Sequence, residues 1–268
     1  MDKRISVLSC GWLGFPLAIE LQKNGFLVKG ARTSVERVTE LQQVGINAYQ
    51  VLLSPEQIIA PAEFWESDIV VINLPPRIQR GKEAHIAEMQ LLNKLLADSA
   101  VAQVIFISST SVYAANEGIV TEEDTELPAT PNGQALREVE STFLQNRKFA
   151  TTVLRFGGLI GYNRLPDARR FGALPDTLAQ PMNVIHRDDC IAIISALILN
   201  PQPGEIFNAC AGEHPLRYTW YEKAAIKLGL TLPPLAPETP VKGKIIDSGK
   251  LLRQLSYSFK YNDPMQLF

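Results

Sequence analysis

The chain has 268 residues, of which 46% are hydrophobic and 20% charged, a composition typical of globular proteins with a sizeable core. Its 26 basic and 28 acidic residues nearly cancel and neither sign forms a long run, so nucleic acid is not expected as a partner. Three cysteines without CxxC or Cys/His spacing argue against disulfides and zinc, and they favour a cytoplasmic location. The first apolar run is too short for a signal peptide, and none approaches the ~20 residues of a membrane helix.

Residues 1–160 alternate between predicted strands and helices. Short apolar runs indicate buried strands, and apolar residues at helical spacing indicate helices. In chain order, strands are expected at 5–8, 26–30, 48–52, 68–74, 101–108 and 151–158, and helices at 15–25, 34–45, 84–97 and 135–145. Ser54, Pro55 and Gln57 form a capping box that predicts the start of a further helix. The alternation predicts an α/β protein with the doubly wound parallel sheet of a Rossmann fold.

Beyond Gly161 the pattern is less regular. In chain order, we expect an irregular segment at 164–176, a strand and a helix over 183–199, a strand at 205–210, a helix ending at Gly229 and a proline-rich loop at 232–240. Asp188 or Asp189 is the expected N-cap of the first of these helices. Thr219 and Glu222 form a capping box before the second.

A glycine-containing turn follows the first strand and opens the first helix. It occupies the place of a GxGxxG motif, with Ser9 instead of the first glycine. Gly11 lets a pyrophosphate approach the backbone, Gly14 lets the helix pack on the strand, and the helix N-terminus stabilises the anion. We therefore expect a dinucleotide to bind at Ser9, Gly11, Trp12, Leu13 and Gly14. A purely structural turn is the alternative, and the serine leaves a sugar nucleotide or mononucleotide open as the ligand.

The end of the second strand indicates which dinucleotide is expected. NAD enzymes usually place Asp or Glu there to bind the ribose hydroxyls, but this chain reads GARTS, with Arg32 at the strand end. Arginine at this place favours a 2′-phosphate, so NADP is expected over NAD, with Arg32 and Ser34 as cofactor-binding residues. A solvated loop arginine is the alternative for Arg32, and Ser34 is also the expected cap of the next helix.

Five segments carry a resemblance over almost the whole chain: GWLGFPLA, ISSTSVYA, LRFGGLIG, NVIHRDD and GKIID. In this order they resemble the bacterial YeeZ-like proteins, atypical members of the extended short-chain dehydrogenase/reductase superfamily, which also includes NAD-dependent epimerases and dehydratases. The resemblance implies a dinucleotide-binding region over 1–160 and a smaller substrate-binding region over 161–268, packed as one compact chain that forms a homodimer. It places Leu74 and Pro75 near the cofactor ribose, and Gly157 and Gly158 near the nicotinamide.

The resemblance also indicates candidate catalytic and substrate-binding residues. Ser109 in ISSTSVYA matches the family's catalytic Ser/Thr, and Tyr113 matches the tyrosine of its VYG element. Ser109 is expected to bond a substrate oxygen, and Tyr113 is a candidate general acid/base; a polar strand end and a packing tyrosine are the other interpretations. Arg164 matches an arginine of GIYGPGR-type relatives and is expected either to face an anionic substrate or to lie on the surface.

The superfamily's catalytic pair, a tyrosine followed four residues later by a lysine, is absent from this sequence. Residues at this spacing share one helix face, so the lysine lowers the pKa of the tyrosine. The family's YGxxKxxxE helix aligns with NGQALREVE, so Asn132 takes the position of the tyrosine and Leu136 that of the lysine. Asn132 is expected to contact the substrate. We expect an NADP-dependent oxidoreductase or epimerase/dehydratase with a non-standard proton relay and an unidentified small-molecule substrate, or a non-catalytic dinucleotide-binding sensor or scaffold.

Two further polar groups are interpreted as structural. His186 lacks metal-ligand spacing to His85 and His214, so a structural histidine is expected, and no metal site is predicted. Residues 122–124 (EED) are expected to form a solvated acidic loop, because no apolar surrounding is indicated that would raise their pKa.

Overall fold

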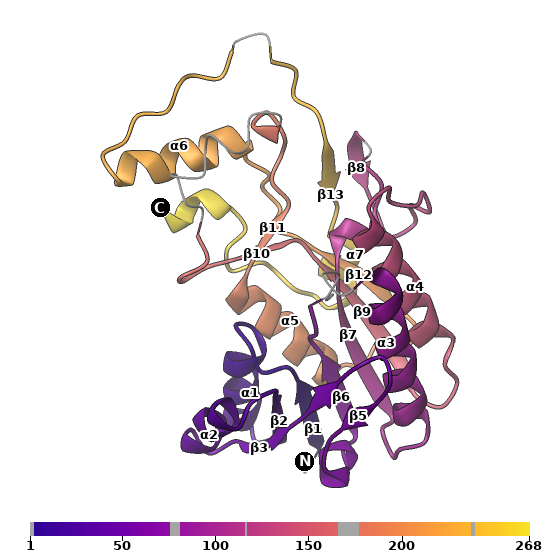
Figure 1. Cartoon of the computed structure of the whole chain (residues 1–268). Coiled ribbons are helices and arrows are strands. Elements are labelled where there is room, and N and C mark those ends of the chain that lie inside the picture. Colours follow the sequence, from indigo (N-terminus) through magenta and orange to yellow (C-terminus); the bar gives the residue numbers. More distant parts are fainter. Residues whose placement is uncertain (1–2, 76–80, 116, 166–176, 237–238) are drawn as a thin grey trace.

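The computed structural model describes residues 3–75, 81–115, 117–165, 177–236 and 239–268, so most of the irregular segment predicted at 164–176 lies outside the described residues. Its centre is a seven-stranded parallel sheet in the order β12-β9-β7-β6-β1-β2-β3. The strands are β1 (Arg4–Leu8), β2 (Leu27–Arg32), β3 (Asn47–Gln50), β6 (Ile69–Ile72), β7 (Gln103–Ser109), β9 (Ala150–Phe156) and β12 (Ile206–Ala209). This order, with helices on both faces (Figure 1), confirms the predicted doubly wound Rossmann sheet.

Two layers of helices bury the two faces of the sheet. They are built from α1 (Gly14–Lys23), α2 (Val35–Gln43), α3 (Lys82–Ala97), α4 (Pro131–Gln145) and α5 (Arg187–Leu199). All of β6 is buried, as expected of a central parallel strand. Val71 and Ile105 face the core that contains α1 and α5, whereas Val70 and Val104 face the core that contains α3 and α4. Because the strands run in one direction, their carboxyl ends share one edge of the sheet, and this edge carries the candidate site.

The capping box at Ser54 does not begin a helix, so this prediction was wrong. The Ser54 hydroxyl accepts hydrogen bonds from the N–H groups of Glu56 and Gln57, as a helix cap would. The chain then forms β5 (Ile58–Ile59), which pairs antiparallel with β4 (Leu52–Leu53). The serine therefore closes a hairpin turn, because the β-branched isoleucines that follow favour a strand. The short 3-10 helix η1 (Ala62–Trp65) comes next.

Residues after β9 contribute to the main sheet and to a smaller part beyond its carboxyl edge. This smaller part contains β10 (Gly158–Ile160) paired with β11 (Val184–His186), α6 (Arg217–Lys227), η6 (Pro264–Leu267), and β13 (Lys244–Ile246) paired with β8 (Gly118–Val120), which precedes β9. Helix α7 (Gly249–Gln254) instead packs on β12, and its Leu251 belongs to the main core. The helix α6 and the C-terminus lie away from the main sheet (Figure 1). Strand β12 and helix α5 belong to the main core, so the division of the chain at residue 160 stays a prediction.

Two helices begin at residues other than the predicted ones. The N-cap of α5 is His186, whose Nδ1 accepts a hydrogen bond from the N–H of Asp188 at 3.2 Å, and neither aspartate caps the helix. Helix α6 begins at Arg217, so the capping box of Thr219 and Glu222 lies inside the helix. Over the described part of the chain, no helix has both the length and the apolar character needed to cross a membrane.

Candidate functional site

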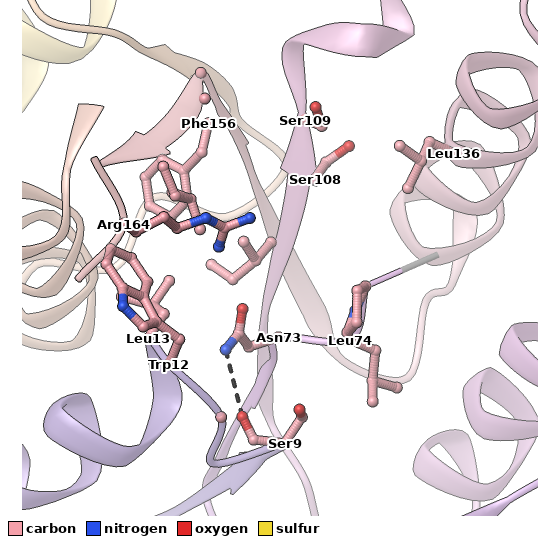
Figure 2. Close-up of a pocket in the computed structure, with 16 residues that line it drawn as sticks. Ser9, Trp12, Leu13, Asn73, Leu74, Ser108, Ser109, Leu136, Phe156 and Arg164 are labelled. Carbon is pink, nitrogen blue, oxygen red and sulfur yellow. Dashed lines mark hydrogen bonds between the residues drawn. The ribbon is translucent and has the colours of Figure 1, made fainter. Parts of the chain in front are cut away.

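A cavity of about 530 Å³ lies at the carboxyl ends of β1, β6, β7 and β9 (Figure 2). It brings together most of the predicted site residues: Ser9, Gly11, Trp12, Leu13, Leu74, Pro75, Ser109, Gly157, Gly158 and Arg164. Leu136 of α4 also lines it. Sequence reasoning missed Asn73, Ile107, Ser108, Phe156 and Leu159. These five residues lie at the same strand ends as the predicted ones, and that position is the signal that could have identified them.

The glycine turn between β1 and α1 is tightly packed at one position and open at another. A Cβ on Gly14 would lie 2.3 Å from the backbone oxygen of Ser9, so only glycine lets the helix approach the strand this closely. Ser9 has φ 76°, a left-handed conformation that costs energy in a residue with a side chain. Asn73 supports the turn, since its Nδ2 donates to Ser9 O at 3.3 Å. At Gly11 a Cβ would meet only Ser9 Oγ, at 4.0 Å, so the backbone there is open to a ligand.

A smaller cavity, of about 70 Å³, adjoins the first on the β2 side. Its lining consists of Leu8, Ser9, Ala31, Arg32, Thr33, Val51, Leu53 and Leu74, of which Ser9 and Leu74 also line the large cavity. Arg32 Nε is buried and has no hydrogen-bond partner within the described part of the chain, while its Nη2 lies 3.8 Å from Glu40. Ser34 is the N-cap position of α2 without a side-chain capping bond, and it lines neither cavity.

The adjacent serines at the end of β7 are placed differently. Ser109 precedes the 3-10 helix η3 (Thr110–Val112), and its Oγ accepts a hydrogen bond from the N–H of Ser111 at 3.2 Å. This bond leaves the Ser109 proton free to be donated into the cavity. The Ser108 side chain is buried, and its Oγ has no hydrogen-bond partner among the described residues. Both hydroxyls therefore retain hydrogen-bonding capacity at the cavity wall.

Tyr113 lies behind the cavity, in a buried polar network. Its hydroxyl donates to Asn208 Oδ1 and accepts from Arg155 Nη1, both at 2.7 Å, and Arg155 forms an ion pair with Glu140 at 2.6 Å. Burial raises the pKa of Tyr113, so the phenol stays protonated. Tyr113 is not one of the residues that line the cavity. The geometry thus supports a packing role, and its predicted acid/base role stays untested.

The interpretation of 122–124 as a solvated acidic loop holds for Glu123, which is exposed in a turn, but not for Glu122 and Asp124. Glu122 Oε1 accepts a hydrogen bond from the N–H of Asn208 at 2.7 Å, at the end of the network around Tyr113. Asp124 Oδ2 accepts from the N–H of Thr121 at 2.8 Å. Both acids are half-buried, since they satisfy backbone donors that the sequence pattern could not reveal.

The first turns of α4 carry Asn132 and Leu136, the residues that the resemblance aligns with the tyrosine and lysine of the family's catalytic pair. Leu136 is buried and lines the cavity, so an apolar side chain faces the ligand space at the lysine place. Asn132 does not line it, although its Oδ1 is buried without a hydrogen-bond partner among the described residues. A Cβ on Gly133 would lie 2.3 Å from Ser111 O, so this glycine allows η3 to pack against α4.

Arg164 and Trp12 form part of the cavity wall on the side opposite α4 (Figure 2). The Arg164 guanidinium lies over the Trp12 ring, 5.3 Å from its centroid, and the Trp12 Nε1 donates to Asn163 Oδ1 at 2.8 Å. Arg187 lies 5.0 Å from the same ring. Arg164 is exposed and is the charged residue among those described as lining the cavity. Its position suits recognition of a negatively charged group.

His186 supports the segment that carries Arg164. A Cβ on Gly161 would lie 2.3 Å from His186 Nε2, and the His186 ring packs on Tyr261 with centroids 3.7 Å apart. Burial lowers the pKa of His186, which keeps the imidazole neutral and its Nδ1 able to cap α5. In the described part of the chain, no group of three or more His, Cys, Asp or Glu side chains is arranged to hold a metal ion.

Comparisons with known proteins place this geometry in a family. No family model matches the chain. Protein YeeZ of Escherichia coli (strain K12) is 32% identical over 268 residues, which cover 98% of each chain. A putative NAD-dependent epimerase/dehydratase from Methylobacillus flagellatus has a similar structure, with a TM-score of 0.80, 22% identity and coverage of 99% of this chain and 96% of that one.

A structure of UDP-glucuronic acid 4-epimerase from Bacillus cereus in complex with UDP-glucuronic acid and NAD also matches, with a TM-score of 0.75 and 19% identity. The match covers 96% of this chain and 94% of the epimerase. Identities this low show a shared fold, whereas the identity to YeeZ over nearly the whole of both chains shows the family. The chain therefore belongs to the YeeZ-like family, and it shares its fold with the NAD-dependent epimerases and dehydratases compared above.

Proposed function

We propose that this chain binds NADP along the carboxyl edge of the sheet and acts as an oxidoreductase or epimerase/dehydratase without the Tyr/Lys pair. The observation that carries the proposal is the pair of cavities that meet at Ser9 and Leu74, beside the glycine turn. A dinucleotide has two nucleosides joined by a pyrophosphate, so it needs two adjoining spaces with an anion site between them. The NAD complex of the Bacillus cereus epimerase, which shares this fold, supports the same class of ligand.

The residues around the two cavities fit the parts of a dinucleotide. The open backbone at Gly11 and the N-terminus of α1 offer an anion site for the pyrophosphate. We assign Leu74 and Pro75 to the ribose, and Gly157 and Gly158 to the nicotinamide. Gly158 is exposed, and a Cβ there would meet nothing closer than 3.4 Å, so a flat ring has room to approach it.

Arg32 supports NADP over NAD. Its Nε is a buried donor without a hydrogen-bond partner in the described structure, and a 2′-phosphate would supply the missing acceptor. The contact to Glu40, at 3.8 Å, is long for a hydrogen bond and leaves the guanidinium available. Ser34 follows closely in the chain, but it lines neither cavity and its side chain is hydrogen-bonded to the Glu36 carboxylate, so this geometry gives no support to its predicted contact with the phosphate.

The residues of the large cavity suggest how a substrate would be held. The nicotinamide, when bound, would supply or accept a hydride. Ser109 can donate its free proton to a substrate carbonyl or alcohol oxygen, because its Oγ already accepts from Ser111. A serine hydroxyl stays protonated at neutral pH, so Ser109 would orient and polarise the oxygen while water or the substrate carries the proton. Arg164 would bind an anionic group of the substrate. Asn132 does not line the cavity, so this geometry gives no support to its predicted contact with the substrate.

Thermal melting of the chain with NADPH, NADH, NADP and NAD in parallel tests this proposal. A ligand at 100 times its dissociation constant stabilises the folded state by about 2.7 kcal/mol, enough for a clear shift in Tm. We expect a larger shift with the phosphorylated pair, lost in Arg32→Ala. Arg147→Ala is the control, because Arg147 is exposed and lines neither cavity. No shift with any of the four dinucleotides would contradict the proposal.

A non-catalytic sensor or scaffold is the second candidate, and Leu136 is the observation that favours it. An apolar side chain lines the cavity at the place where the superfamily's lysine acts, so the usual proton relay has no counterpart there. Incubation of the NADPH-bound chain with a panel of aldehydes, ketones and nucleotide sugars separates the two candidates. Oxidation of NADPH or conversion of a sugar supports the enzyme, whereas tight binding without turnover supports the sensor.

A further inference from the structure

Ser108 lines the large cavity and carries a buried hydroxyl that has no hydrogen-bond partner among the described residues. The residue is only 6% exposed, and its Oγ is inaccessible to solvent. Ser108 lines the cavity, and its hydroxyl points from β7 toward Leu136 of α4 (Figure 2). A buried hydroxyl without a partner destabilises the folded state, so such a group is retained where something else supplies the hydrogen bond.

The order of the strands determines which part of a dinucleotide would reach Ser108. From β2 toward β9, the strand ends carry Arg32, then Ser9, Leu74, Ser108 and finally Gly157. With the 2′-phosphate at Arg32 and the pyrophosphate at the glycine turn, the next group along the ligand is its second sugar. The nicotinamide follows at Gly157. The ends of β6 and β7 therefore face the sugar that carries the nicotinamide.

The neighbouring side chains leave that sugar with few protein partners. Leu136 has no polar atom to offer, and the hydroxyl of Tyr113 is held by Arg155 and Asn208. The Asn73 amide nitrogen is hydrogen-bonded to the backbone at Ser9. Among the buried groups without a hydrogen-bond partner, Ser108 is thus the one whose strand ends beside the expected position of the sugar.

We propose that the Ser108 hydroxyl binds a hydroxyl of the nicotinamide-bearing sugar, and so provides from β7 a polar contact that Leu136 cannot provide from α4. This inference rests on the proposed function, because it assumes that a dinucleotide occupies the two cavities. It differs from the role of Ser109, which is directed to the substrate oxygen. Ser108 is accordingly a cofactor-positioning residue.

Isothermal titration of Ser108→Ala with three probes tests the inference. NADPH and ADP-ribose 2′-phosphate both contain the second sugar, whereas adenosine 2′,5′-bisphosphate ends before it. Loss of one hydrogen bond should raise the Kd of the first two by about three- to tenfold and leave that of the third unchanged. The ligand-free variant should unfold at the same urea concentration as the wild type or a higher one, because the substitution removes an unpaired buried hydroxyl. A merely structural serine would shift this midpoint downward.

Ser111→Ala is the matched control. The Ser111 Oγ is also buried without a hydrogen-bond partner in the described structure, but Ser111 does not line the cavity, so its Kd values should equal those of the wild type. The inference is overturned if Ser108→Ala binds NADPH as tightly as the wild type, or if its affinity for adenosine 2′,5′-bisphosphate falls equally. Either result leaves the proposed function intact. If the wild type binds none of the three probes, the proposed function and the inference fail together.

Discussion

Gly14→Ala should destabilise the ligand-free fold, and the structure gives the size of the effect. The added Cβ would lie 2.3 Å from Ser9 O and 3.1 Å from Ser9 C, both backbone atoms, and 3.2 Å from Asn73 Nδ2. A backbone obstacle cannot rotate away, so α1 must shift relative to β1, an overpacking cost of about 3 kcal/mol. Alanine returns about 1 kcal/mol through its higher helix propensity. The net loss of about 2 kcal/mol corresponds to a fall in Tm of about 4 to 8 °C.

Urea unfolding of the ligand-free chain measures this loss, and Gly11→Ala is the control from the same turn. A Cβ on Gly11 would meet nothing closer than 4.0 Å, so this variant should keep its free energy of unfolding within about 0.5 kcal/mol. Gly11→Ala should instead weaken NADPH binding, because the new methyl group enters the cavity that Gly11 lines. The packing argument is refuted if Gly14→Ala unfolds like the wild type, or if both variants lose the same stability.

Two further predictions concern buried charge. Arg155→Met should lower the free energy of unfolding by about 3 to 5 kcal/mol, because Glu140 would keep a buried charge without its partner. Urea unfolding measures this loss, and the double variant Arg155→Met/Glu140→Leu should recover stability. If the single and the double variant lose the same free energy of unfolding, the argument is contradicted. Burial lowers the pKa of His186 and of His214 below 6.5, because the folded protein favours the neutral imidazoles. The folded state therefore has its full stability above pH 6.5, and it loses stability as the pH falls through the folded-state pKa values of the two histidines. Melting between pH 5 and pH 8 should show a shallower loss in His186→Asn, which keeps a capping side chain, and an unchanged slope would exclude this role.

The main sheet could be predicted because its signals are local. The buried run at Ile69–Ile72 indicates a central strand by itself, and alternation with helical patterns indicates parallel pairing. The small strands could not be predicted, since Gly118–Val120 pairs with Lys244–Ile246, far along the chain. The hairpin of β4 and β5 was mistaken for a helix, because a serine that bonds to N–H groups two and three residues later serves both structures.

The part of the candidate site that could be predicted is the part formed by a single continuous segment of the chain. The turn from Ser9 to Gly14 is of this kind, because strand, glycines and helix follow one another directly. Asn73 and Ser108 were missed because they join the site only when the ends of β6 and β7 lie side by side. The sequence also could not orient Tyr113, since the turn of η3 separates it from β7 and directs its hydroxyl to Arg155.

The leucine at position 136 and the burial of Arg155 belong to one arrangement on α4. Leu136 and Glu140 are four residues apart and therefore share a helix face, so a lysine at 136 would lie beside the Glu140 carboxylate. In this chain the cation that pairs with Glu140 is Arg155, which comes from β9 and is buried behind the cavity with Tyr113. The charge balance of α4 is thus met inside the protein. The α4 side of the cavity is left apolar, so any ligand there depends on the neutral hydroxyls at the end of β7.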